Sequence, residues 1–234
     1  MLEPLRTSKG LSLIALFAAL HTVLSILPFS IAIGVSGGSI TLGIISATLI
    51  GITLGPISGG LAVLIGSVIG MFLNPSGALL LAASFLPPTM GAISSGFLIT
   101  KRGYISAVML LVGIIAFYSH TFGLEAIYYP FMHIIALVLA LIFSTRLAGW
   151  SKELSDIKKL SLGIPIAAFV GTLTDHIIGS SLYLWMFELP AQVWNSIIFI
   201  YPIERIVAVI ITAVITLPLL YSLNKSGILN VIRR

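Results

Sequence analysis

The sequence predicts an all-α integral membrane protein, a bundle of about eight transmembrane helices forming a single domain over residues 1–234. The first observation is composition: 58% hydrophobic residues, 8% charged residues and a mean hydropathy of +1.16 exclude an ordinary soluble domain. The second is charge patterning, because every Lys and Arg except Arg205 falls in five short clusters separated by apolar stretches. The clusters are Arg6/Lys9, Lys101/Arg102, Arg146/Lys152, Lys158/Lys159 and Lys225/Arg233/Arg234.

The clusters predict the topology. Lys and Arg accumulate in cytoplasmic loops, and the intervening connections 30–39, 74–77, 118–126 and 188–196 contain neither residue. Eight crossings put all five clusters on one side, so we expect a multi-pass protein of the cell membrane with both termini cytoplasmic. The net charge of +5 is then explained by an anionic lipid bilayer, and no nucleic-acid partner is expected.

Four crossings are predicted between the first two clusters. The first span covers about 11–29 and is followed by an uncharged Gly/Ser loop at 30–39. Segment 40–73 is too long for one span and breaks at Gly55-Pro56 into two short helices, either of which is open to a re-entrant interpretation. The fourth span is 78–100. Pro87-Pro88 falls inside it, which predicts a kinked helix that lines a cavity or is explained by packing alone.

The C-terminal part predicts four further crossings. Spans five and six cover about 104–119 and 127–147, and the polar linker 148–160 follows them. Spans seven and eight cover about 161–187 and 197–222. Each apolar run is near the length that a helix needs to cross the hydrocarbon core.

Small residues recur at helical spacing in two places. Ala15, Ala18 and Ala19 lie within one turn of the first span, and Gly51, Gly55 and Gly59 are spaced four apart. Such residues let two helix backbones approach closely in lipid. Packing within the chain and docking of a partner subunit both remain open.

Three segments resemble the substrate-binding (S) component of energy-coupling factor (ECF) vitamin transporters. The run Leu13–Leu20 resembles that family's AxxxA helix, Ile52–Gly60 its LGPxxG junction, and Tyr201–Leu220 its closing helix. The family has six helices, so the hairpin 104–147 is an addition to an S-component-like core. The resemblance implies binding of a vitamin-like small-molecule substrate, with loop 30–39 as a lid. It also implies docking through Ala15, Ala18 and Ala19 on a coupling transmembrane subunit that is driven by ATPase subunits.

A polar constellation lies inside the last two spans. Asp175-His176 is near the middle of span seven, and Glu204-Arg205 is about two turns into span eight from its outer end. Charged side chains at membrane depth are costly, so they must face partners or water. A pairing of Arg205 with Asp175 or Glu204 is expected. An ion-pair clamp, the polar floor of a substrate pocket and a proton relay are the three interpretations.

The outer mouth of these spans is rich in aromatic and amide side chains. Trp185, Trp194 and Asn195 are the candidate wall of the pocket, although an interfacial aromatic belt accounts for them equally well. The predicted substrate-binding set is therefore Asp175, His176, Glu204, Arg205, Trp185, Trp194 and Asn195.

No cofactor, metal site or catalytic motif is predicted. The chain has no cysteine and shows no Walker, HExxH or Gly-x-Ser-x-Gly motif, so any ATP hydrolysis belongs to partner subunits. A haem is disfavoured because His120 and His133 lie near outer helix ends and His21 and His176 have no evident partners. The alternatives to a substrate-binding subunit are an accessory subunit of a larger membrane complex and a proton-coupled secondary carrier.

Overall fold

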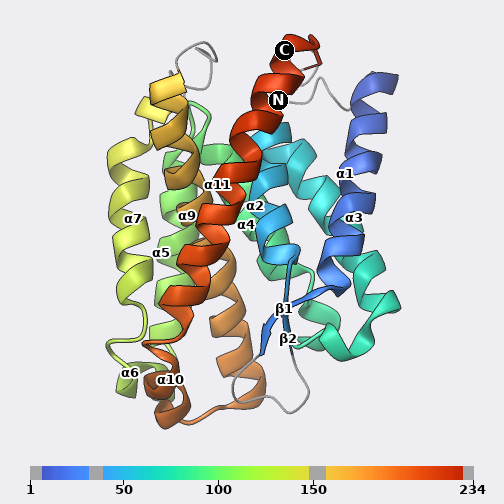
Figure 1. Cartoon of the computed structure of the whole chain (residues 1–234). Coiled ribbons are helices and arrows are strands. Elements are labelled where there is room, and N and C mark those ends of the chain that lie inside the picture. Colours follow the sequence, from blue (N-terminus) through green and yellow to red (C-terminus); the bar gives the residue numbers. More distant parts are fainter. Residues whose placement is uncertain (1–6, 32–38, 148–156, 229–234) are drawn as a thin grey trace.

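The computed structural model describes residues 7–31, 39–147 and 157–228, and within these ranges the chain is almost entirely helical (Figure 1). Arg6, Lys152, Arg233, Arg234 and most of the predicted lid lie outside the described residues. In the described part, eight helices have 12 or more residues. They are α1 (Ser8–Ile26), α2 (Gly43–Leu54), α3 (Pro56–Leu73), α4 (Leu86–Leu98), α5 (Tyr104–Tyr118), α7 (Phe131–Phe143), α9 (Ile157–Phe187) and α11 (Tyr201–Lys225).

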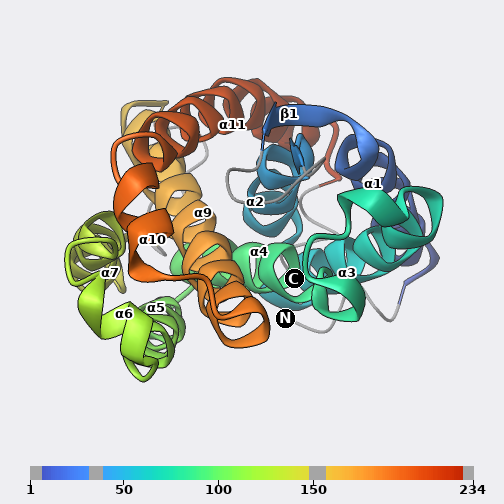
Figure 2. The ribbon, with the colours of Figure 1, turned by 90° about the horizontal axis from the view of Figure 1, so that it is seen from below.

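Helices α2, α4 and α9 form the centre of the bundle (Figure 2). Every residue of α2 is buried, because α1, α3, α4, α9 and α11 all pack against it. Its 12 residues extend about 18 Å, against a hydrocarbon core of about 30 Å. A helix enclosed by protein does not have to match that thickness, which explains how so short an apolar helix is accommodated.

The outer surface is apolar. Large hydrophobic side chains are exposed along the outward faces of α1, α5, α7 and α11. Contiguous apolar surface on this scale is not tolerated in water. Five of the described helices are long and apolar enough to cross a membrane. Three of them are α1, α3 and α11. The other two are the stretch Leu81–Leu98, which contains α4, and Lys159–Phe187, which is most of α9. The architecture is therefore that of an all-helical protein compatible with a membrane.

The two ends of the bundle differ. The N-terminal end of α1 and the C-terminal end of α11 lie at one end of the bundle, and the opposite end carries a small β-hairpin with two short helices (Figure 1). These are β1 (Pro28–Ile31), β2 (Ser39–Thr41), α6 (Thr121–Glu125) and α10 (Ala191–Ile197). Lys9 at the start of α1, Arg146 after α7 and Lys225 at the end of α11 all belong to the end where α1 begins and α11 ends. These basic residues thus lie at the end away from the hairpin, whereas Arg205 lies on the cavity at the other end.

The break within 40–73 is confirmed at Gly55. This residue separates α2 from α3 and has φ +82°, a conformation that favours glycine. Pro56 then occupies the first turn of α3, where its missing N–H leaves no hydrogen bond unmade.

Two predicted boundaries are wrong. The first helix ends at Ile26, because residues from Pro28 onward pair with β2 as an antiparallel strand. The fourth helix begins at Leu86 after two 3-10 turns, η2 (Pro75–Gly77) and η3 (Leu81–Ala83). Pro87-Pro88 therefore lies in the first turn of α4, and it starts the helix rather than kinking its middle.

The glycines of α2 and α3 and Ala18 of α1 pack within the chain. A Cβ on Gly51 would collide with the Ala92 carbonyl of α4, and one on Gly59 would lie 2.9 Å from Gly51 Cα. A Cβ on Gly66 would lie 2.6 Å from the Ala18 carbonyl. Backbone therefore meets backbone at these crossings, which is how small residues join helices in lipid.

We predict that Gly51→Val destabilises the protein. The added side chain meets backbone atoms of α4, which cannot rotate away, and overpacking of this kind costs about 1–3 kcal/mol. The apparent melting temperature of the detergent-purified protein should fall by several degrees. Gly179→Ala is the matched control, because a Cβ there lies at an ordinary 3.5 Å from Pro87. Equal melting temperatures for the two variants would contradict the close α2–α4 crossing.

Candidate functional site

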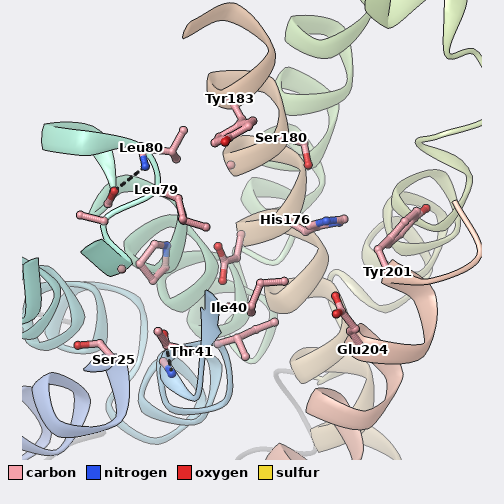
Figure 3. A pocket seen from close by; sticks show the side chains of 18 of the residues that line it. Ser25, Ile40, Thr41, Leu79, Leu80, His176, Ser180, Tyr183, Tyr201 and Glu204 are labelled. Atoms are coloured by element: carbon pink, nitrogen blue, oxygen red, sulfur yellow. Dashed lines mark hydrogen bonds between the residues drawn. The ribbon is translucent and has the colours of Figure 1, made fainter. Parts of the chain in front are cut away.

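A cavity of about 290 Å³ lies toward the hairpin end of the bundle. Figure 3 shows its labelled side chains around a central space: His176, Ser180 and Tyr183 from α9, Tyr201 and Glu204 from α11, and Ser25, Thr41, Leu79 and Leu80 from the other side. Residues from α10, including Trp194, complete the wall. A volume at the lower end of the range for ligand pockets suits a small molecule.

Two carboxyl groups and one guanidinium, those of Asp175, Glu204 and Arg205, line this cavity, and no ion pair joins them among the described residues. Arg205 is 6% exposed, and its Nε is buried with no hydrogen-bond partner among the described residues. Asp175 and Glu204 also line the cavity, and within the described chain neither carboxylate lies within 4.0 Å of Arg205 as an ion pair. The expected pairing of Arg205 is therefore absent from this part of the structure. The three side chains share the lining of one cavity, at a distance from one another that is longer than a direct ion pair.

The backbone positions of these groups follow from helix packing. Asp175 lies in α9 where that helix crosses α4, and a Cβ on Gly91 would lie 2.8 Å from Asp175 Cβ. Glu204 lies in the first turn of α11, which begins at Tyr201 and not at the predicted residue 197. The partial positive charge of that helix end stabilises the Glu204 carboxylate. Asp175 lies in the middle of α9, so the charge of a helix end does not stabilise its carboxylate.

His176 belongs to a hydrogen-bonded network behind the cavity wall. Its Nδ1 is 3.1 Å from His133 Nε2, and its Nε2 is 3.3 Å from the Tyr129 hydroxyl. That hydroxyl also lies 2.8 Å from Ser180 Oγ. The sequence analysis found no second histidine near His176, and the structure places His133 beside it.

Aromatic rings form one side of the cavity. Tyr129 lies 5.0 Å from Trp194 and 5.1 Å from Tyr201 between ring centroids, and His176 lies 4.8 Å from Tyr201. The Tyr201 hydroxyl donates to the Tyr129 carbonyl at 2.7 Å. Burial raises the pKa of Tyr129 above its usual value, so its hydroxyl stays protonated. The wall is rigid, flat-faced and uncharged.

The opposite side is lined by hydroxyls and a histidine. His21 is buried and connects α1 to α2 and α3 through Ser46 and Ser67. Ser46 Oγ donates to the Gly43 carbonyl, so it accepts from His21 Nδ1–H at 2.7 Å, and Ser67 Oγ donates to Nε2 at 2.9 Å. In a neutral ring with the proton on Nδ1, both nitrogens of His21 are thus satisfied by serine hydroxyls.

The predicted site residues divide into two groups. Asp175, His176, Glu204, Arg205 and Trp194 share the lining of one cavity. Trp185 is outside that lining; it is 54% exposed and donates through Nε1 to the Ala116 carbonyl at 3.0 Å. Asn195 is exposed and is also outside the lining.

The three alanines of α1 differ in their exposure. Ala15 and Ala19 are exposed on the outer face of the helix, whereas Ala18 is 3% exposed and packs toward α3. A surface for a partner on α1 would therefore contain Ala15 and Ala19 but not Ala18.

Sequence reasoning missed Tyr129 and His21 as cavity residues. Tyr129 precedes α7 in the hairpin 104–147, which was interpreted as an addition outside the core. Helices α5 and α7 in fact pack on α9, so the hairpin supports the site. For Tyr129, the signal in the sequence was an aromatic residue in a loop without Lys or Arg. For His21, the signal was a histidine in one helix with serines in the two helices that follow it.

The chain is 38% identical, over 165 residues, to an uncharacterized protein of Methanocaldococcus jannaschii. The aligned region is 70% of this chain and 54% of that protein, so the chain spans about half the length of the relative it matches. No protein-family model and no solved structure matches the chain.

Proposed function

We propose that the chain is the membrane-embedded substrate-binding subunit of an ECF-type importer for a vitamin-like small molecule. The observation that carries the proposal is the cavity, into whose wall Arg205, Asp175 and Glu204 are built without pairing to one another. Charges without partners are costly in an apolar surrounding, and the cost is greatest for Arg205, which is buried, whereas Asp175 and Glu204 are half-buried. Such charged side chains are retained where they bind a molecule that enters the cavity. Their presence therefore supports binding of a polar ligand.

In this proposal all eight long helices cross the cell membrane and both termini are cytoplasmic. The position of Lys9, Arg146 and Lys225 at the end of the bundle away from the hairpin supports this orientation. The cavity then lies toward the outer face, where a subunit that captures substrate from outside needs it.

Energy comes from partners in this proposal, and no catalytic step is assigned to the chain. The exposed alanines of α1, Ala15 and Ala19, support docking on a coupling transmembrane subunit, because small exposed residues allow another helix to approach closely. That subunit in turn is driven by ATPase subunits.

The test begins with purification of the chain alone in detergent, followed by denaturation and mass spectrometry of what is released. We expect one small polar compound at a stoichiometry near one per protein. Uptake of that compound into proteoliposomes should require ATP and the partner subunits. An empty protein would favour an accessory subunit, and uptake by the chain alone that collapses with an uncoupler would favour a proton-coupled carrier.

A further inference from the structure

We propose that the ligand of this cavity is a small organic cation with a flat ring and a hydrogen-bond acceptor. The inference rests on the proposed function of the cavity as a ligand site and specifies the class of ligand. It follows from three features of the wall: its charge, its aromatic faces and the place of Arg205.

The first feature is the charge of the cavity lining. Among the described residues, two carboxyl groups, Asp175 and Glu204, and one guanidinium, Arg205, line it, which gives a formal charge of −1. The lining histidines, His21 and His176, are counted as neutral, and each is hydrogen-bonded through both ring nitrogens. A ligand of charge +1 makes the occupied site neutral, and neutrality matters most where water is excluded.

The second feature is the presence of aromatic rings in the same lining as these charges. Asp175 and Glu204 are two carboxyl groups against the single guanidinium of Arg205, so one negative charge of the lining is not balanced within the described residues. Tyr201 and Trp194 line the same cavity, and aromatic faces attract cations through their ring quadrupoles. Carboxylates and ring faces together suit a ring that carries its own positive charge or an amidine-like group.

The ligand is an organic cation rather than a bare metal ion. Within the described ranges, no three His, Asp or Glu side chains converge as metal ligands. The cavity volume of about 290 Å³ corresponds to roughly ten water molecules, which is far more room than one ion needs.

The third feature is Arg205, whose buried and unpartnered Nε requires an acceptor. In the proposed complex that acceptor is a carbonyl, hydroxyl or ring nitrogen of the ligand. The site thus recognises a cation at Asp175 and an acceptor at Arg205, with the ring between the aromatic side chains of the wall.

The experiment uses three planar probes of nearly equal shape and different charge: benzamidine (+1), benzamide (0) and benzoate (−1). Binding to the purified full-length chain, freed of any copurified compound, is measured by thermal shift and by calorimetry. We expect benzamidine to bind at least about tenfold more tightly than either of the others, as a charge-assisted contact predicts.

Asp175→Asn keeps the shape of the side chain and removes its charge. We expect it to abolish most of the preference for benzamidine, whereas Glu125→Gln, an exposed carboxylate outside the cavity lining, should bind all three probes like the wild type. Benzamidine binding no tighter than benzamide or benzoate would overturn the proposal, and so would an unchanged preference in Asp175→Asn.

The outcome is separable from that of the proposed function. Suppose that the compound extracted from the native protein is neutral or anionic and is imported with ATP. This result would contradict the cation proposal and support the importer proposal. Binding of benzamidine that depends on Asp175, without ATP-dependent uptake of any extracted compound, would keep the cation site and remove the importer.

Discussion

Replacing Arg205 with leucine should lower the affinity for the compound extracted from the wild-type protein by roughly 10- to 100-fold. Arg205 lines the cavity with an unpartnered Nε, and the loss of one charge-assisted hydrogen bond costs about 1.5–3 kcal/mol. The melting temperature of the ligand-free variant should stay within a few degrees of wild type, because no hydrogen bond or ion pair of the described residues is lost. Calorimetry and thermal unfolding in detergent measure the two effects.

The two readouts distinguish a ligand-binding group from a structural one. If Arg205 clamped helices α9 and α11 together, breaking a buried pair would cost about 3–5 kcal/mol and the ligand-free variant would unfold at a much lower temperature. Arg146→Leu is the control, since Arg146 is an exposed cation at the other end of the bundle. A large loss of stability without a loss of affinity would contradict the assignment.

Much of the fold was predictable because hydrophobic runs and glycine-proline junctions are local signals. The break at Gly55-Pro56 could be predicted because a positive φ favours glycine and the first turn of a helix favours proline, so both residue types indicate a helix boundary. The β-hairpin was missed because strands β1 and β2 exist only through each other, and each is too short to show alternation. Pro87-Pro88 was misplaced because an apolar run does not reveal where its helix begins.

The site was partly predictable for a similar reason. Charges within apolar spans stand out, so Asp175, His176, Glu204 and Arg205 were identified, and the structure brings them to one cavity. The choice between Trp194 and Trp185 required knowledge of which helix face turns inward. Trp194 is buried through its place on α10, whereas Trp185 turns outward on α9. Tertiary packing decides such directions, and a single sequence does not contain them.

Replacing both Ala15 and Ala19 with tryptophan should reduce ATP-driven uptake to background while ligand binding persists. Both residues are exposed on the outer face of α1, so the larger side chains meet no atom of the chain's own core. In the proposed importer, however, they would hold the helix of the coupling subunit away, because close approach in lipid depends on small residues. Uptake into proteoliposomes and ATPase activity that copurifies with the tagged chain are the measurements.

Ile210→Trp is the control for this pair, because Ile210 is 56% exposed on α11, a different outward-facing helix. It should retain both uptake and associated ATPase activity. Ala18 is unsuitable for the same test: it is buried near Gly66, so a tryptophan there would disrupt the α1–α3 contact and confuse folding with docking. Normal uptake by the Ala15/Ala19 double variant would remove α1 as the docking helix. A loss of ligand binding in that variant would show instead that α1 transmits strain to the cavity through His21 and Ser25, which lie on its cavity side.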